Sequence, residues 1–357
     1  MTIPERMSAV LLTRHGGADA LRWSDDVAVP VPGPGQVLVR VLAAGVNNTD
    51  INTRIGWYSP DVTGATDAVG DAEVEAGGWS GALEFPRIQG GDICGAVVAV
   101  GAGVQRPGPG DRVTSQINIP RPTGDNPTAY VALGSELDGA FAQYCLLEAA
   151  ECFDVSASPL SDVEIAAMPC AFGTAFNLLT RAGCRAGQTV LVTGASGGVG
   201  LAAVQLAALR GAVVTGVTSA AKAEFVRDAG AAETVDRDAA LPQDAFDVVI
   251  DVVAGPGWGA LIDALKPGGD YAVAGAIAGP VVEADLRRIY LRDITLHGAS
   301  FLPHKVFADL IALINDGAVR PLVSRVYPLA DIARAQADFV EKRYPGKLVL
   351  TPPEGQT

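Results

Sequence analysis

The sequence predicts a two-domain α/β protein in which a β-rich domain precedes a doubly wound parallel sheet. Three observations lead to this expectation. Short strand-like runs separated by glycine and proline fill the chain as far as Leu147, apolar strands and helices alternate from about Ser161 onward, and the segment VLVTGASGGVG (190–200) is typical of a strand, a tight glycine turn and a helix. Regular alternation of strands and helices builds a parallel sheet covered on both faces.

Size and composition are consistent with two such domains. The chain has 357 residues, of which 49% are hydrophobic. A formal net charge of −14 argues against nucleic acid and anionic membranes as partners, because phosphate binding requires clustered basic residues. The N-terminal segment does not resemble a signal peptide and no apolar stretch is long enough to span a bilayer, so we expect a cytoplasmic protein. The five cysteines lack C-x-x-C spacing, which argues against a disulfide framework or a four-cysteine zinc lobe.

The first domain is expected to be a twisted, barrel-like arrangement of short strands. Proline and glycine turns such as VPVPGPG (29–35) punctuate runs of β-branched residues. The expected strands are residues 7–13, 36–46, 90–104, 110–116 and 139–147.

The second domain is expected to begin with a helix. Ser161 followed by Glu164 is a capping-box pattern, and helical apolar spacing continues to Gly183. After the glycine turn we expect strands at 212–217, 246–253, 270–278 and 294–301, and helices at 220–229 and 258–265. A tail of two helices (305–314 and 331–342) and a strand (346–350) is expected to rejoin the first domain.

Two segments look like insertions, because loops longer than about 12–15 residues are uncommon unless they are functional or mobile. Residues 59–84 are rich in Gly, Asp and Ala, and residues 116–137 are polar and contain proline. Trp79 and Phe85 give the first insertion apolar surface to bury. We expect this insertion to form part of the wall of a substrate cleft.

The glycine turn predicts a dinucleotide-binding site. Gly194 and Gly197 let the chain turn and approach a pyrophosphate, and Gly200 permits close contact between helix and strand, although Ala195 stands where a G-x-G-x-x-G fingerprint would begin. The apolar run at 212–217 follows at the spacing of a βαβ unit. An ordinary glycine loop is the alternative. The expected contact residues are Gly194, Ala195, Ser196, Gly197, Gly198, Val199 and Gly200.

The residues beyond this turn favour NADP(H) over NAD(H). A fold specific for NAD places an acidic residue about 20 residues past the turn to bind the ribose 2′-hydroxyl, and none occurs between Leu201 and Ala223. Instead Thr218, Ser219 and Lys222 could hold a 2′-phosphate, with Arg237 as a weaker candidate. The alternative is that Ser219 caps the next helix and Lys222 is a solvated side chain.

Nearly the whole chain resembles the medium-chain dehydrogenase/reductase superfamily, and most closely its zinc-free quinone oxidoreductase-like branch. The segments that carry the resemblance occur in order: PVPGPGQVLVRV (30–41), GVNNTDINTRIGWY (45–58), GGDICGAVVAVG (90–101), PGDRV (109–113), the glycine turn, FDVVIDVV (246–253), LKPGGDYAVAG (265–275) and GKLVL (346–350). The resemblance implies a GroES-like domain (1–159 and 302–357), a Rossmann domain (160–301) and an active site in a cleft between them.

The resemblance also allows the metal ligands of the zinc alcohol dehydrogenases in this superfamily to be compared. Their catalytic zinc is held by a cysteine in G-V-C-x-T-D, a histidine in G-H-E and a later cysteine, and this chain has Asn47, Gly91 and Cys170 at those places. Glycine has no ligand atom and an amide is a poor zinc ligand, so we expect no metal. His15, His297 and His304 form no ligand cluster and are expected to be surface or packing residues. Cys170 either packs or lines the cleft beside the nicotinamide.

Without zinc, hydrogen-bond donors must stabilise the charge that develops on the substrate oxygen. The candidates are Asn47, Thr49 and Tyr58, whereas Asp50 is expected to fix the loop structurally. Each candidate also has a structural reading: Asn47 could satisfy a turn, Thr49 could cap a helix and Tyr58 could be a packed aromatic.

Further cofactor contacts are implied by the resemblance and by the tendency of such folds to bind ligands at the carboxyl ends of strands. The residues at family positions around the nicotinamide are Thr174, Val253, Ala254, Gly275 and Phe301. Lys347, in GKLVL, is expected to be an exposed charge on an edge strand.

The leading hypothesis is therefore a zinc-independent NADPH-dependent reductase that delivers hydride to a quinone or an α,β-unsaturated carbonyl. An NADP-dependent alcohol or carbonyl oxidoreductase is the second hypothesis, and a catalytically silent NADPH-binding structural or sensing protein is the third. The resemblance implies a homodimer formed by strand pairing near residues 294–301.

Overall fold

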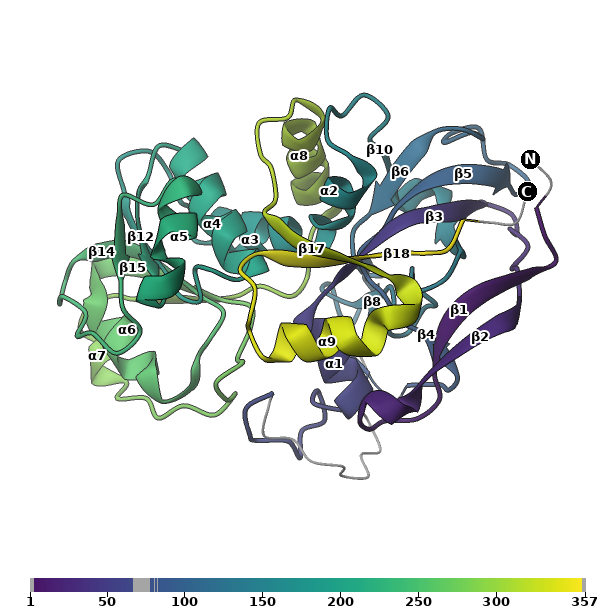
Figure 1. Cartoon of the computed structure of the whole chain (residues 1–357). Helices are drawn as coiled ribbons and strands as arrows, with labels where there is room; N and C mark the ends of the chain where they lie inside the picture. The colour runs from purple at the N-terminus through teal and green to yellow at the C-terminus, as the bar shows by residue number, and fades with distance from the viewer. Residues whose placement is uncertain (1–2, 67–77, 80, 82, 355–357) are drawn as a thin grey trace. The chain divides into compact units, whose positions relative to one another are not determined.

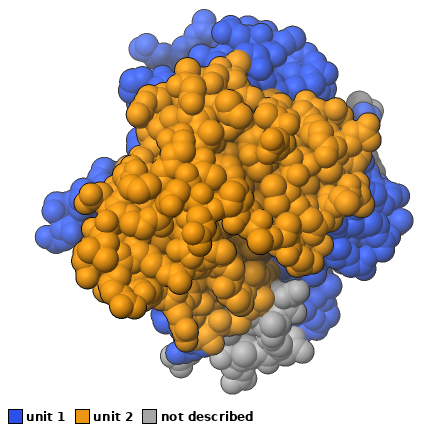
Figure 2. Space-filling view, turned by 90° about the vertical axis from the view of Figure 1, so that its left-hand side faces the viewer, with its two compact units in different colours: residues 1–62, 69–170, 303–357 blue, residues 63–68, 171–302 orange. Residues whose placement is uncertain are grey.

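The computed structural model describes residues 3–66, 78–79, 81 and 83–354. These residues form two compact units (Figure 2). Unit 1 contains the described residues of Met1–Val62, Val69–Cys170 and Pro303–Thr357, and unit 2 those of Thr63–Ala68 and Ala171–Leu302. The C-terminal tail thus belongs to the same unit as the N-terminal segments, as Figure 1 shows by the position of the yellow strands β17 and β18 next to β3.

Unit 1 is built on a mainly antiparallel sheet whose strand order is β10-β6-β5-β3-β18-β17, with β9 also paired to β3. Smaller sheets have the orders β2-β1-β4 and β7-β8. The strands are β1 (Arg6–Leu12), β2 (Leu21–Ala28), β3 (Gln36–Val46), β4 (Arg87–Ile88), β5 (Cys94–Val100), β6 (Arg112–Ser115), β7 (Asn118–Pro120), β8 (Tyr130–Ala132), β9 (Tyr144–Glu148), β10 (Cys152–Asp154), β17 (Val323–Pro328) and β18 (Lys347–Thr351). Their inward-facing aliphatic side chains form one buried core.

Four helices accompany this sheet: α1 (Asn48–Ile55), α2 (Asp162–Ala166), α8 (His304–Asn315) and α9 (Ile332–Val340). Helix α9 packs on β3, β17 and β18, and α2 packs on β3 and β5. Helix α1 follows β3 directly, so the residues at the end of β3 and the start of α1 are held by the centre of the sheet.

Unit 2 contains a six-stranded parallel sheet with the order β13-β12-β11-β14-β15-β16. Its elements are α3 (Pro169–Arg181), β11 (Thr189–Val192), α4 (Gly198–Leu209), β12 (Val213–Val217), α5 (Ala223–Asp228), β13 (Glu233–Val235), β14 (Phe246–Asp251), α6 (Trp258–Ala264), β15 (Leu265–Val273), α7 (Arg287–Tyr290) and β16 (Thr295–Gly298). This order places the first strand, β11, in the middle, which is the doubly wound arrangement of a Rossmann fold. The predicted fold class is confirmed.

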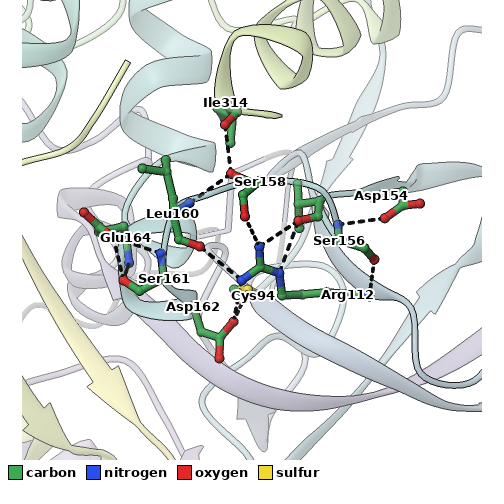
Figure 3. Close-up of polar contacts among 11 residues, drawn as sticks. Cys94, Arg112, Asp154, Ser156, Ser158, Leu160, Ser161, Asp162, Glu164 and Ile314 are labelled. Carbon is green, nitrogen blue, oxygen red and sulfur yellow. Dashed lines mark hydrogen bonds and ion pairs between the residues drawn. The ribbon is translucent and has the colours of Figure 1, made fainter. Parts of the chain in front are cut away.

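The connection between β10 and α2 is held by one guanidinium group. Arg112, at the start of β6, donates hydrogen bonds to the carbonyl oxygens of Val155, Ser158 and Leu160 and to Asp162 (Figure 3). Because a guanidinium offers five donors in a fixed plane, it can satisfy several carbonyls of an irregular segment at once. The Ser161–Glu164 capping box then starts α2 as predicted.

Several expected elements differ in extent. The helix expected from 161 to 183 is divided into α2 and α3, because Pro169 has no N–H for the preceding turn and disfavours helical backbone at Met168. The strands expected at 270–278 and 294–301 are found as β15 and the shorter β16. Strand β2 and strand β17 were not expected from the sequence, and β7 and β8 form a hairpin within the second insertion. Much of the first insertion, residues 67–77, 80 and 82, lies outside the described residues.

None of the helices in the described part of the chain is both long enough and apolar enough to cross a membrane.

Candidate functional site

The predicted cradle in unit 2 has the backbone that close approach of a ligand requires. Gly194 has a φ of 54°, in the left-handed region. A Cβ atom on Gly200 would lie 2.2 Å from the carbonyl oxygen of Gly194, so only glycine allows α4 to start this close to the turn. A Cβ atom on Gly197 would meet only that same oxygen, at 3.4 Å, so the outer side of the turn is open.

Helix α4 begins at Gly198, and its first intrahelical hydrogen bond runs from Leu201 N–H to Gly197 C=O. The N–H groups of the first turn have no intrahelical acceptors, and the helix dipole adds partial positive charge there. Ser196 and Val199 are half-buried beside this turn, whereas Ala195 is buried. The first turn of α4 therefore has the free N–H groups that could hold an anionic group such as a pyrophosphate.

The end of β12 carries polar groups that fit a 2′-phosphate. Thr218 is only 4% exposed, and its hydroxyl oxygen is buried without a hydrogen-bond partner among the described residues. Ser219 occupies the N-cap position before residues 220–222, but its side chain makes no capping hydrogen bond. Among the described residues, the Thr218 hydroxyl therefore has no partner and the Ser219 side chain does not cap the following turn.

Two positive charges lie next to these hydroxyls. The pKa of Lys222 is lowered, first by burial of its ammonium group and second by the positive charge of Arg237. Like charges held near one another repel, and an anion bound between them would remove that repulsion. These charges and hydroxyls are the groups that could hold a phosphate at the end of β12.

The residues expected around the nicotinamide lie at the carboxyl edge of the parallel sheet or on the helix before it. Val253 and Ala254 follow β14 and Gly275 follows β15. Phe301 follows β16, and its carbonyl oxygen accepts hydrogen bonds from Asn177 and Arg181 of α3, the helix that also carries the half-buried Thr174. A Cβ atom on Gly275 would lie 3.0 Å from the Val252 carbonyl oxygen, so glycine brings the two loops close together.

Unit 1 contains a buried polar cluster around Asn47, which follows β3 and is the N-cap residue of α1. Asp92 is 0% exposed; its Oδ2 accepts a hydrogen bond from Asn47 Nδ2 at 2.9 Å, and its Oδ1 accepts one from Cys170 N–H at 2.6 Å. Lys347 Nζ donates to Asp92 Oδ2 at 3.0 Å, to the Val46 carbonyl oxygen at 3.1 Å and to Asn47 Oδ1. Asp92 is not among the site residues predicted from the sequence; its only signal there is one acidic residue within the apolar segment GGDICG.

The expectation that Lys347 is an exposed edge charge is wrong. Its side chain is 3% exposed, because β18 pairs with β3 on one side and β17 on the other and is therefore not an edge strand. A buried ammonium must be paired and hydrogen-bonded, and Lys347 uses all three of its donors in this cluster.

Lys347 also fixes the orientation of the Asn47 amide. An ammonium group only donates, so the Asn47 atom that faces it must be the oxygen, and the nitrogen must then face Asp92. One Nδ2 hydrogen is used by Asp92; no described residue accepts the other. The second Nδ2 hydrogen of Asn47 is therefore a donor whose orientation is fixed by Lys347 and Asp92.

Asp50, in the first turn of α1, fixes the start of this helix, as expected. Its carboxylate accepts a hydrogen bond from Asn47 N–H at 2.8 Å. Burial, together with the nearby charge of Asp92, raises the pKa of Asp50 to about 7. Thr49, in the first turn of α1, is not the N-cap; its buried hydroxyl oxygen has no partner among the described residues and remains a possible donor to a ligand.

Tyr58 lies among aromatic residues from both insertions. Its ring stacks on Trp79 with centroids 5.6 Å apart, Trp79 makes an edge contact with Tyr130, and Trp57 makes an edge contact with Tyr58. Burial raises the pKa of Tyr58, whose side chain also forms a hydrogen bond with Asn52. Tyr58 is therefore a packed aromatic residue, and its hydroxyl remains protonated at neutral pH.

The residues at the expected zinc positions do not fit a zinc ion. A Cβ atom on Gly91 would lie 2.0 Å from Ile117 Cδ1, so an isoleucine fills the space that a ligand side chain would need. Asn47 is already bound to Asp92 and Lys347. Across residues 3–66, 78–79, 81 and 83–354, no group of three or more His, Cys, Asp or Glu side chains is arranged to hold a metal ion.

The three histidines contact protein atoms instead. His15 contacts the carbonyl oxygens of Thr53 and Arg54, and Phe85 packs edge-on against its ring. His297 pairs with Asp270, and His304 packs on Phe153.

A Rossmann unit with an intact dinucleotide turn, joined to a β unit of this topology, defines a nicotinamide-type oxidoreductase fold. Comparison with known proteins agrees. Residues 33–157 match the alcohol dehydrogenase GroES-like domain, and residues 198–316 match the domain described as zinc-binding dehydrogenase. The chain belongs to the medium-chain dehydrogenase/reductase superfamily.

Relatives of nearly full length have several reaction types. An acryloyl-coenzyme A reductase of Metallosphaera sedula is 30% identical over 97% of this chain and 100% of its own length. A quinone oxidoreductase of Sus scrofa is 28% identical over 96% and 97% of the two chains. The crystal structure of a putative alcohol dehydrogenase from Sinorhizobium meliloti 1021 has a TM-score of 0.89 and 43% identity, and the match covers 98% of each chain.

Proposed function

We propose that this protein is a zinc-independent, NADPH-dependent oxidoreductase that transfers hydride to a quinone or to an α,β-unsaturated carbonyl compound. The observation that carries the proposal is the cluster around Asn47. Where a zinc enzyme needs three metal ligands, this chain has a hydrogen-bond donor held by Asp92 and Lys347, and a glycine whose surroundings are filled by Ile117.

The choice of NADP(H) is supported by unit 2. The first turn of α4 would hold the pyrophosphate, and Thr218, Ser219, Lys222 and Arg237 would hold the 2′-phosphate. Val253, Ala254, Gly275, Phe301 and Thr174 are proposed to contact the nicotinamide. When bound, the cofactor supplies the hydride.

The chain's own contribution to the reaction is proposed to come from Asn47, Thr49 and Tyr58. Negative charge develops on the substrate oxygen as hydride arrives at carbon, and a fixed donor stabilises it without having to reorient. Asn47 offers one Nδ2 hydrogen in an orientation set by Lys347 and Asp92. The raised pKa of Tyr58 keeps its proton in place, so it would serve as a donor and not as a base.

Reduction of a saturated carbonyl, or oxidation of an alcohol, is the second candidate. It is favoured by Cys170, which stands at a zinc-ligand position, and by the similarity to a putative alcohol dehydrogenase. The backbone N–H of Cys170 donates a hydrogen bond to Asp92, and this contact gives Cys170 a structural role in the cluster.

The two candidates are separated by NADPH oxidation measured side by side with a quinone, an enone and a saturated ketone. Our proposal predicts turnover of the quinone or the enone. Turnover of the ketone alone would favour the second candidate. NADPH binding without turnover in a broad substrate screen would indicate a silent NADPH-binding protein, and absence of NADPH binding would contradict all three hypotheses.

We also propose a homodimer and a cytoplasmic location. Strand β16 ends the parallel sheet, and Leu286, Tyr290, Leu291 and Leu296 on and near it are exposed apolar residues that a second copy could cover. The five cysteines are all free, which fits a reducing compartment. Sedimentation of the purified protein tests the dimer.

A further inference from the structure

A single buried carboxylate ties together the three central strands of unit 2 at the edge where ligands bind. Asp251 is the last residue of β14, which lies between β11 and β15. It is 0% exposed. Asp251 is not among the site residues predicted from the sequence and has no role in the proposed function.

All the hydrogen-bond partners of Asp251 act as donors. The hydroxyl of Thr193, next to the end of β11, donates to Oδ1 at 2.6 Å, and the hydroxyl of Tyr271 on β15 donates to Oδ2 at 2.6 Å. The backbone N–H groups of Val253 and Ala254 donate to the same carboxylate at 2.9 to 3.2 Å. The Asp251 carboxyl group is therefore the acceptor in each of these contacts.

The network fixes the backbone of residues 252–254. Val252 N–H donates to the Thr193 hydroxyl at 3.1 Å, so each of the three N–H groups in this loop is held by Thr193 or Asp251. Ala254 has φ 52° and ψ −140°, a conformation that is unfavourable for a residue with a side chain. Such a conformation persists only when surrounding contacts impose it, and the two contacts from Ala254 N–H to Asp251 do so.

The same carboxylate connects this loop to the glycine turn. Thr193 immediately precedes Gly194, and its hydroxyl bridges Asp251 and Val252. One side chain therefore sets the position of the proposed nicotinamide loop relative to the proposed pyrophosphate turn.

The opposite end of β14 provides a natural control. Asp247 accepts hydrogen bonds from Thr189 of β11 and Lys266 of β15, and so joins the same three strands at their amino ends. It differs in two respects: its side chain is 30% exposed and it is paired with a cation. Ligands are not expected at this edge of the sheet.

We propose that Asp251 is a positioning residue that holds the loop 252–254 in its ligand-binding conformation and so determines affinity for the nicotinamide half of NADP(H), independently of the adenosine half. The inference rests on the proposed function, because it takes residues 253 and 254 as nicotinamide contacts. It is specific to Asp251, since Asp247 supports the same strands without touching that loop.

The test compares two ligands on three proteins. NADPH and adenosine 2′,5′-bisphosphate, which lacks the nicotinamide half, are titrated into wild type, Asp251→Asn and Asp247→Asn. We expect Asp251→Asn to weaken NADPH binding about tenfold, because the amide nitrogen replaces an acceptor oxygen and faces groups that only donate to this side chain. Binding of the bisphosphate is expected to change less than about twofold. Asp247→Asn is expected to leave the ratio of the two affinities unchanged.

The outcomes separate the inference from the proposed function. If wild type binds neither ligand, the proposed cofactor is wrong and the inference falls with it. If wild type binds both and Asp251→Asn weakens them equally, or weakens neither, the cofactor proposal stands and the positioning role is refuted. Should Asp251→Asn fail to fold, Tyr271→Phe removes one donor to the Asp251 carboxyl group. This variant is expected to lose about threefold in affinity for NADPH and none in affinity for the bisphosphate.

Discussion

Replacement of Lys347 by methionine isolates the charge at the centre of the unit 1 cluster. Methionine has a similar length and shape but no ammonium group, so the variant keeps the packing of β18 and removes three hydrogen bonds. Asp92, which is fully buried, keeps its contacts with Asn47 and Cys170 but loses its only ion-pair partner among the described residues. Breaking a buried pair on one side costs about 3–5 kcal/mol, because the remaining charge stays desolvated.

A second ion pair in the same chain provides the matched control. Lys266 Nζ lies 3.0 Å from Asp247 Oδ2, the same distance as in the pair of Lys347 and Asp92, but these side chains are 39% and 30% exposed. A pair that is open to water contributes only about 0–1 kcal/mol. Lys266→Met is therefore expected to be several-fold less destabilising than Lys347→Met.

The assay is urea unfolding followed by tryptophan fluorescence. Trp23, Trp57 and Trp79 belong to unit 1 and Trp258 to unit 2, so far-ultraviolet circular dichroism is recorded in parallel to follow both units. The double variant Lys347→Met/Asp92→Asn removes both charges and is expected to recover about 2 kcal/mol relative to Lys347→Met. If Lys347→Met costs no more than Lys266→Met, or if the double variant recovers nothing, the buried charge pair does not organise the cluster.

Three further predictions concern the cradle, cofactor choice and pH. Gly200→Ala places a Cβ atom against the backbone and is expected to lower the free energy of unfolding by about 1–3 kcal/mol. Gly197→Ala is expected to preserve stability but to weaken NADPH binding. Equal melting temperatures for the two variants would contradict this prediction. Lys222→Ala is expected to weaken NADPH binding about tenfold and to leave NADH binding unchanged, as measured by titration. Equal losses of affinity for the two cofactors would argue against a 2′-phosphate contact. Burial raises the pKa of Asp50 from 3.8 to about 7, so its protonated form stabilises the fold at low pH and this contribution is lost as pH rises to about 7. Asp50→Asn is therefore expected to reduce the decline in unfolding free energy over this range, and an unchanged pH profile would contradict the assignment.

The cradle could be predicted from the sequence because its determinants are local. The turn, its glycines and the following helix lie within the stretch from Val190 to Leu209, and the order of strands and helices around it defines the parallel sheet. Helix and strand boundaries were less accurate; Pro169, for example, divides a pattern that reads as one helix.

The polar cluster could be predicted only in part because its members are distant in sequence. Asn47 and Lys347 are 300 positions apart, and they meet because β18 pairs with β3 so that Leu348 lies opposite Val46. Nothing in GKLVL specifies that pairing, so Lys347 reads as an edge charge. Likewise, the order of FDVVID places Asp251 at the carboxyl end of its strand, but nothing in the sequence shows that Thr193 and Tyr271 donate hydrogen bonds to it.

We propose that this chain reduces its substrate with NADPH and without a metal. The most direct test is the rate of NADPH oxidation with an enone or quinone before and after exhaustive treatment with a zinc chelator, with the metal content measured on the same samples. We predict the same rate at a metal content near zero, because Asn47 and Gly91 offer no zinc site. A rate that falls with the zinc content and returns when zinc is added would contradict the proposal that the reaction needs no metal.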